Sequence, residues 1–124
     1  MARILIAEDE DSLRVLVARA LVQDGHQVMT ALDGAEALDV LTREQGAFEL
    51  LLTDIRMPVM DGIALALAAA RDHPRLVIVL MTGYADQRER VSGLEALICD
   101  VISKPFALAE IKFAVASALA KGKR

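Results

Sequence analysis

Short apolar runs alternate with amphipathic segments along the 124 residues, and this alternation constrains the fold more than any other feature. An apolar run bounded by turn signals is typical of a strand buried on both faces, and apolar residues spaced by three and four are typical of a covering helix. Strands that alternate with helices form a doubly wound parallel sheet, an α/β fold. The predicted strands are residues 3–7, 27–31, 50–53, 76–81 and 100–103.

The segments between and after these runs predict five helices, over residues 12–24, 33–45, 62–72, 85–92 and 107–121. In the first helix, Asp11 or Ser12 is placed to cap the N-terminus and Gly25 to close the C-terminus. The segment from Gly93 to Cys99 fits an extension of the fourth helix, a loop or a longer fifth strand. No repeat, low-complexity stretch or linker interrupts the pattern. A single domain over residues 1–124, without an output domain, is therefore expected.

Composition narrows the classes of function. Hydrophobic residues make up 55% of the chain, aromatic residues only 3%, and the net charge is −4. Few stacking residues and a negative charge argue against nucleic-acid binding. The single cysteine, Cys99, excludes an internal disulfide and is typical of a small buried apolar residue. No run approaches the roughly 20 apolar residues of a membrane span and no secretory signal is visible, so a cytoplasmic protein is expected.

Polar side chains follow four of the predicted strands at the point where each strand ends. Glu8 and Asp9 follow the first strand, Asp54 the third, Thr82 the fourth and Lys104 the fifth. The carboxyl ends of parallel strands lie at one edge of the sheet, where ligands bind in open α/β folds. Taken alone, the acid pair and Lys104 are more typical of a loop or a cap than of a functional site. Their joint occurrence at one edge indicates a functional site.

The chemistry of this set points to phosphoryl transfer. Two carboxylates about 4 Å apart repel by about 4 kcal/mol at an effective dielectric constant near 20, so three carboxylates need a cation. The oxygen-only set of Glu8, Asp9 and Asp54 suits Mg²⁺, and the pattern contains no His or Cys that would favour zinc or copper. An Asp carboxylate is a nucleophile toward phosphorus. Mg²⁺, Lys104 and the Thr82 hydroxyl would each neutralise one phosphoryl oxygen.

The same segments resemble the receiver domains of two-component response regulators. The resemblance covers almost the whole chain and implies a flavodoxin-like receiver fold with five helices and strand order 2-1-3-4-5. It also implies a phosphoprotein of a phosphorelay rather than an enzyme. The matching segments are Ile4-Leu-Ile-Ala-Glu-Asp9, Thr53-Asp-Ile-Arg-Met-Pro-Val-Met-Asp-Gly62, Leu80-Met-Thr-Gly-Tyr84 and Ser103-Lys-Pro-Phe106.

This resemblance implies a role for each acidic residue of the site. Asp54 is the phosphoacceptor and one of the metal ligands. Asp9 binds Mg²⁺ directly and Glu8 holds it through water, while the backbone carbonyl of Arg56 completes the protein ligands. Arg56 and Tyr84 flank the phosphoryl group, at positions that tune its lifetime in the family.

The resemblance also implies which residues transmit phosphorylation to the surface, and this chain departs from the family at one of these positions. Thr82 is the switch hydroxyl. Lys104 contacts the phosphoryl group, and its peptide bond to Pro105 is expected to be cis. The family carries an aromatic residue three positions before the lysine, where this chain has Val101. A valine has no ring to move between rotamers. Tyr84, the only tyrosine, is a candidate to replace that ring, and it is equally typical of a packed loop aromatic.

The resemblance also implies two protein partners. A histidine kinase or histidine phosphotransfer protein is expected beside the first helix, from Ser12 to Arg19. A downstream target is expected on the face formed by the fourth helix, the fifth strand and the last helix. Phe113 lies off the apolar stripe of the last helix, so it is either exposed on that face or a rim residue of the core.

A finer resemblance is to stand-alone receivers of the CpdR type, which steer regulated proteolysis. It implies that this chain has such a role. The segments that carry it are Met1-Ala-Arg-Ile-Leu-Ile-Ala-Glu-Asp9, Thr53-Asp-Ile, Thr82-Gly83 and Ser103-Lys-Pro-Phe106.

Three alternative functions are compatible with the sequence. The chain is a relay intermediate that passes its phosphoryl group onward, or a binding module that works without phosphate, or a small phosphatase with an Asp nucleophile. Phosphatases that resemble the dehalogenase group need a second acid two residues after the nucleophile. This chain has Arg56 at that position, which argues against the third alternative.

Overall fold

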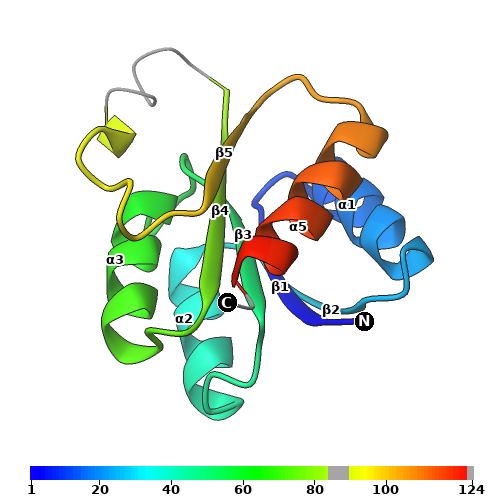
Figure 1. The fold of residues 1–124 in the computed structure, drawn as a ribbon. Coiled ribbons are helices and arrows are strands. Elements are labelled where there is room, and N and C mark those ends of the chain that lie inside the picture. Colours follow the sequence, from blue (N-terminus) through cyan, green and yellow to red (C-terminus); the bar gives the residue numbers. More distant parts are fainter. Residues whose placement is uncertain (84–89, 123–124) are drawn as a thin grey trace.

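A five-stranded parallel sheet in the order β2-β1-β3-β4-β5 forms the centre of the protein (Figure 1). The structure is a computed structural model that describes residues 1–83 and 90–122. The elements in chain order are β1 (Arg3–Ala7), α1 (Asp11–Gln23), β2 (Gln27–Ala31), α2 (Gly34–Arg43), β3 (Leu50–Asp54), α3 (Gly62–Asp72), β4 (Val77–Thr82), β5 (Asp100–Ser103) and α5 (Leu108–Gly122).

The predicted doubly wound fold and its strand order are confirmed. Three strands have the predicted bounds, whereas β3 ends one residue later and β4 both begins and ends one residue later, so Asp54 and Thr82 belong to strands. The helix predicted over residues 85–92 falls largely outside the described residues, as does Tyr84, and the last helix therefore keeps the label α5. The segment 93–99 consists of turns, which is the loop alternative.

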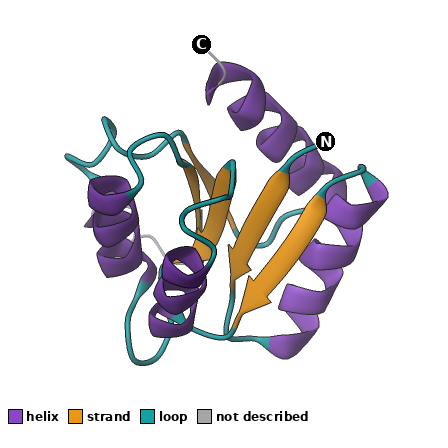
Figure 2. Cartoon of the chain, turned by 90° about the horizontal axis from the view of Figure 1, so that it is seen from below, coloured by secondary structure: helices purple, strands orange, loops and turns teal. Residues whose placement is uncertain are grey.

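Two pairs of helices cover the two faces of the sheet. Helices α1 and α5 pack on one face, and α2 and α3 pack on the other (Figures 1 and 2). Side chains alternate between the two cores along each strand: Leu51 faces α2 and α3, while Leu50 and Leu52 face α1 and α5. Because β3 is central and covered on both faces, all five of its residues are buried. Within the described part of the chain, no helix has the length and apolar character to cross a bilayer.

The start of α1 differs from the prediction, whereas its end agrees with it. Glu10, and not Asp11 or Ser12, is the N-cap residue, and its side chain makes no capping hydrogen bond. Asp11 lies in the first helical turn, where its charge complements the helix dipole and pairs with Arg14 at 2.6 Å. The Ser12 hydroxyl donates to Glu10 Oε1 instead. Gly25 follows the helix with φ 89°, as a closing glycine requires.

The loop between β3 and α3, residues 55–61, is held at both ends by close backbone approaches. A Cβ atom at Gly62 would lie 2.0 Å from the carbonyl oxygen of Asp54. A Cβ atom at Gly34 would lie 2.3 Å from the carbonyl oxygen of Met60, which accepts a hydrogen bond from the Gly34 N–H at 3.1 Å. Both positions need glycine, so the loop leaves the sheet and enters α3 along a fixed path.

Val59 stands at the tip of this loop in a strained conformation. Its φ is 68°, and the Met60 N–H donates to the Pro58 carbonyl at 2.7 Å, which makes a three-residue turn. A left-handed conformation costs an L-residue roughly 1–2 kcal/mol, and it is most unusual for a β-branched one. The side chain is 84% exposed, so packing does not offset this cost.

Val59→Gly is therefore expected to raise the free energy of unfolding by about 1 kcal/mol, measured by urea unfolding. The matched control is Val22→Gly, because Val22 is also an exposed valine but lies in α1. Glycine weakens a helix, so this control is expected to lose about 0.5 kcal/mol. A loss of stability in Val59→Gly similar to that of the control would contradict the strain at Val59.

Candidate functional site

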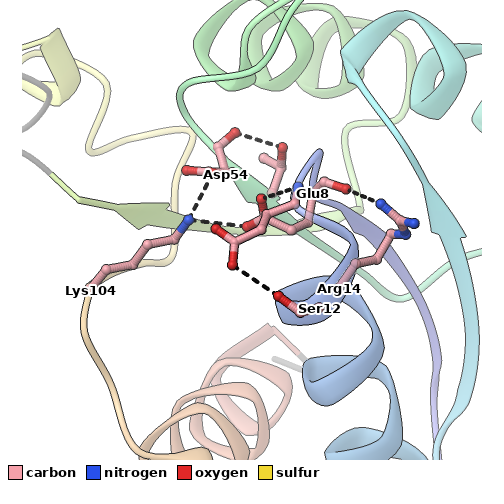
Figure 3. A network of polar contacts seen from close by, with 7 residues as sticks. Glu8, Ser12, Arg14, Asp54 and Lys104 are labelled. Carbon is pink, nitrogen blue, oxygen red and sulfur yellow. Dashed lines mark hydrogen bonds and ion pairs between the residues drawn. The ribbon is translucent and has the colours of Figure 1, made fainter.

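The structure brings four of the expected side chains together at the C-terminal edge of the sheet. Glu8, Asp9 and Asp54 each place one carboxylate oxygen within 4.8 Å of the others. The Lys104 Nζ atom donates to Glu8 Oε1 at 3.1 Å and to Asp54 Oδ2 at 2.8 Å (Figure 3). Glu8 and Asp54 are buried, whereas Asp9 is exposed. One cation therefore bridges two buried carboxylates, and a third carboxylate faces solvent beside them.

Strand register explains why these side chains meet. Ala7 pairs with Thr53 across β1 and β3, so the residues that follow them, Glu8 and Asp54, emerge at the same level of the sheet. Lys104 follows β5, which is separated from β3 by β4. Its long side chain must therefore cross the end of β4 to reach Asp54 and Glu8.

A pocket of about 530 Å³ opens over this cluster. Arg56 and Gly83 line it together with the acidic cluster and Lys104, and Leu13, Pro105 and Phe106 form an apolar side. The Lys104–Pro105 bond is cis, as expected. These lining residues lie at or after the ends of four strands or in the first turn of α1. The edge of the sheet and the loops after its strands therefore form the pocket together.

Thr82 precedes a residue that lines this pocket, whereas Val101 lines a separate groove. Thr82, the expected switch hydroxyl, is the last residue of β4 and is 2% exposed. The described lining of the pocket includes its neighbour Gly83 but not Thr82 itself. Val101 in β5 is half-buried and packs against the core under α2 and α3. The position where an aromatic residue was expected thus holds a valine that packs against the core.

Burial sets the charge state of Glu8. Burial raises the pKa of Glu8 from its ordinary value of 4.5 to about 7, and the negative charge of Asp54 adds to this rise. The Glu10 N–H, which donates to Glu8 Oε2 at 3.1 Å, and the Lys104 ammonium both oppose it. Burial also acts to lower the pKa of Lys104, but the hydrogen bond and charge of Asp54 outweigh burial and raise it. Lys104 therefore stays charged in the site.

The raised pKa of Glu8 predicts a pH dependence of stability. Between about pH 4.5 and about pH 7 the folded protein retains a proton on Glu8 that the unfolded chain has lost. The free energy of unfolding is therefore expected to fall as pH rises through this window, by roughly 3 kcal/mol at most. Urea unfolding across the window measures it, and Glu8→Gln, which does not titrate, is the control. Equal slopes in the two proteins would contradict the assignment to Glu8.

Two side chains that hold the site were not singled out from the sequence. The Arg14 guanidinium donates to the Glu8 carbonyl at 2.9 Å (Figure 3), and it also pairs with Asp11. The Thr53 hydroxyl donates to the Asp54 carbonyl at 2.9 Å and is fully buried. A signal existed for each: an i, i+3 pair of opposite charges at the start of a helix, and a hydroxyl residue inside an otherwise apolar run.

The chain is similar to known proteins along most of its length. Residues 4–116 match the family described as the response regulator receiver domain. Over 111 residues the chain is 40% identical to the response regulator receiver protein CpdR of Brucella abortus (strain 2308), which covers 90% of this chain and 91% of that protein. It is 38% identical over 105 residues to the DNA-binding transcriptional regulator NtrC of Klebsiella pneumoniae, but spans only 22% of that protein.

A solved structure agrees with these relatives. The response regulator protein TrrA of Thermotoga maritima, solved in complex with Mg²⁺-BeF, superposes with a TM-score of 0.83 at 29% sequence identity. The superposition covers 95% of this chain and 99% of that one. The family match, the near end-to-end relation to CpdR and the shared fold lead to one conclusion: the chain belongs to the response regulator receiver domain family.

Proposed function

We propose that this receiver domain accepts a phosphoryl group on Asp54 from a phosphohistidine of a partner protein. The observation that carries the proposal is the bond between Asp54 Oδ2 and Lys104 Nζ, inside a pocket that also holds the carboxylates of Glu8 and Asp9. This arrangement pairs a nucleophile with a fixed cation, and it offers a second, all-oxygen cation site. Both are what phosphoryl transfer needs.

The transfer is a substitution at phosphorus. A carboxylate oxygen of Asp54 forms the new P–O bond while the P–N bond of the phosphohistidine breaks, and the imidazole nitrogen leaves with the electron pair. Lys104 lies beside Asp54 Oδ2 and supplies positive charge to the phosphoryl oxygens. Glu8, Asp9 and Asp54 would hold Mg²⁺ through carboxylate oxygens, and the bound ion would supply further positive charge to the phosphoryl oxygens. The hydroxyl of Thr82, at the end of β4, is proposed to move toward the phosphoryl group and to pull the adjacent loop inward.

The face of α1 beside the pocket suits the phosphodonor. Val15 and Leu16 are exposed apolar side chains within the segment from Ser12 to Arg19, and Leu13 lines the pocket itself. Exposed apolar side chains on a helix that borders the pocket favour contact with an apolar surface of the donor. We assign the kinase or phosphotransfer protein to this face.

The downstream partner is assigned to the face of β5 and α5. Phe113 is 76% exposed, so it lies on the surface and not at the rim of the core. It borders a groove of about 550 Å³ whose other sides include Val101, Ser103 and Glu110. Output through regulated proteolysis, which the resemblance to CpdR-type receivers implies, is proposed for this face. A pull-down that compares the unchanged chain with Asp54→Ala, with and without a phosphodonor, would identify the partner.

Titration with beryllofluoride and Mg²⁺, followed by amide spectra, tests the proposal. Beryllofluoride mimics an acyl phosphate on the carboxylate, so amides near Asp54, Thr82 and β5 are expected to shift only when both Mg²⁺ and beryllofluoride are present. A chelator should reverse the shifts. Spectra that stay unchanged would favour a module that works without phosphate. Onward transfer of the phosphoryl group to a second histidine protein would favour a relay, and sustained turnover of a phosphomonoester would favour a phosphatase.

A further inference from the structure

We infer that Thr53 is a positioning residue, whose hydroxyl fixes the backbone at Asp54 and thereby the path of the loop over residues 55–61 and the geometry of the metal site. The inference rests on the proposed function, because it concerns the site that would hold Mg²⁺. It starts from the bond that the Thr53 Oγ1 donates to the Asp54 carbonyl oxygen at 2.9 Å.

Packing alone does not explain a threonine at this position. Thr53 is fully buried, and its neighbours in the sheet are Ala7 on one side and Leu80 on the other. A valine would fill nearly the same volume in this apolar setting. A buried hydroxyl that is hydrogen-bonded gains little net stability, because it gives up its bonds with water. The hydroxyl is therefore better explained by what it holds than by what it stabilises.

The Asp54 carbonyl lies where the chain leaves the sheet. On one side it accepts the Thr53 hydroxyl, and on the other it meets Gly62 so closely that an added Cβ atom would lie 2.0 Å away. The next carbonyl, that of Ile55, accepts the Gly62 N–H at 2.7 Å. The N–H of the same peptide unit, that of Ile55, donates to the Met81 carbonyl of β4 at 3.1 Å, so the unit is tied to the sheet through its N–H and oriented through its carbonyl. Its orientation sets the direction in which the chain continues to Arg56, the residue whose carbonyl is the expected metal ligand.

Mg²⁺ is sensitive to such a constraint. It demands near-ideal octahedral geometry with short bonds, so a small rotation of the backbone at its ligands lowers its affinity. Removing a group that orients metal ligands typically costs 10–100-fold in affinity. Loss of the Thr53 hydroxyl is expected to act at the low end of this range, about tenfold, because the bond from the Ile55 N–H to the Met81 carbonyl still holds the peptide unit.

Two substitutions separate this role from a purely structural one. Thr53→Val removes the hydroxyl and keeps the volume, so its urea midpoint should equal or exceed that of the unchanged protein, while its Mg²⁺ dissociation constant, measured by calorimetry, rises about tenfold. Thr53→Ser keeps the hydroxyl and loses a buried methyl group, so its urea midpoint should fall while Mg²⁺ binding stays within about twofold. Thr53→Val is thus expected to weaken Mg²⁺ binding without a loss of stability, and Thr53→Ser to lose stability without weaker Mg²⁺ binding.

A second readout needs no metal. In the metal-free protein, amide hydrogen exchange at residues 55 and 56 should quicken in Thr53→Val and stay unchanged in Thr53→Ser. Equal Mg²⁺ affinity in Thr53→Val and the unchanged protein, or equally weak binding in both variants, would overturn the inference. If the unchanged protein itself binds no Mg²⁺, the proposed function fails instead. Hydrogen exchange in the two variants still decides the role of the hydroxyl in that case.

Discussion

Replacing Gly62 with alanine is expected to lower the free energy of unfolding by at least about 3 kcal/mol. The added Cβ atom would lie 2.0 Å from the carbonyl oxygen of Asp54, 2.8 Å from its carbonyl carbon and 2.9 Å from the Cα of Ile55. All three are backbone atoms, so no flexible side chain can move aside. The start of α3 and the end of β3 would have to separate. Urea unfolding measures the loss.

The control for this substitution is Gly83→Ala. Among the described residues, a Cβ atom at Gly83 would come closest to the Lys104 Cδ atom, at 3.8 Å, which is an ordinary contact. Its effect on stability is expected to stay within about 0.5 kcal/mol. Similar stabilities for the two variants would contradict the close approach at Gly62. A large loss of stability in Gly62→Ala alone would show that the path of the loop over residues 55–61 requires a residue without a side chain at position 62.

Asp54→Asn is expected to abolish phosphoryl incorporation while the chain stays folded. An amide is a poor nucleophile toward phosphorus, and the exposed Asp9 is not the carboxylate that Lys104 contacts. The substitution also removes a negative charge beside Glu8, so the pKa of Glu8 is expected to fall from about 7 toward its ordinary value. Intact mass after treatment with a small phosphodonor measures the first effect, and a carboxyl titration by NMR measures the second.

Asp72→Asn is the matched control for that experiment. Asp72 is an exposed aspartate that pairs only with the neighbouring Arg71 in the described ion pairs, on a surface of α3. This variant is expected to take up one phosphoryl group as the unchanged protein does. Phosphoryl incorporation by Asp54→Asn at the same level as Asp72→Asn would place the acceptor elsewhere.

The fold and the convergence of the acidic residues could be predicted from the sequence because both depend on simple patterns. Apolar runs fix the strands, and parallel topology brings their carboxyl ends to one edge. The strand that carries Asp54 was therefore recognisable from a few residues. The same holds for Lys104, although the crossing of its side chain over β4 became visible only in three dimensions.

Features that depend on exact backbone paths could not be predicted. The N-cap of α1 falls on Glu10, although capping preference favours aspartate and serine, because the position of a cap depends on where the backbone enters the helix and not on residue type alone. The left-handed conformation of Val59 contradicts the preference of its own side chain, so no local rule indicates it. The pKa of Glu8 depends on burial by segments far apart in the sequence. The bond from Thr53 to Asp54 depends on a rotamer that the sequence does not contain.

The most direct test of the account is phosphoryl incorporation into the unchanged protein from a small phosphodonor, with and without Mg²⁺, followed by identification of the modified residue. The acyl phosphate can be reduced with borohydride and the labelled peptide sequenced by mass spectrometry. We expect one phosphoryl group per chain, located on Asp54, and its loss when a chelator removes the cation. A label on another residue, or equal incorporation in the presence of the chelator, would contradict the account.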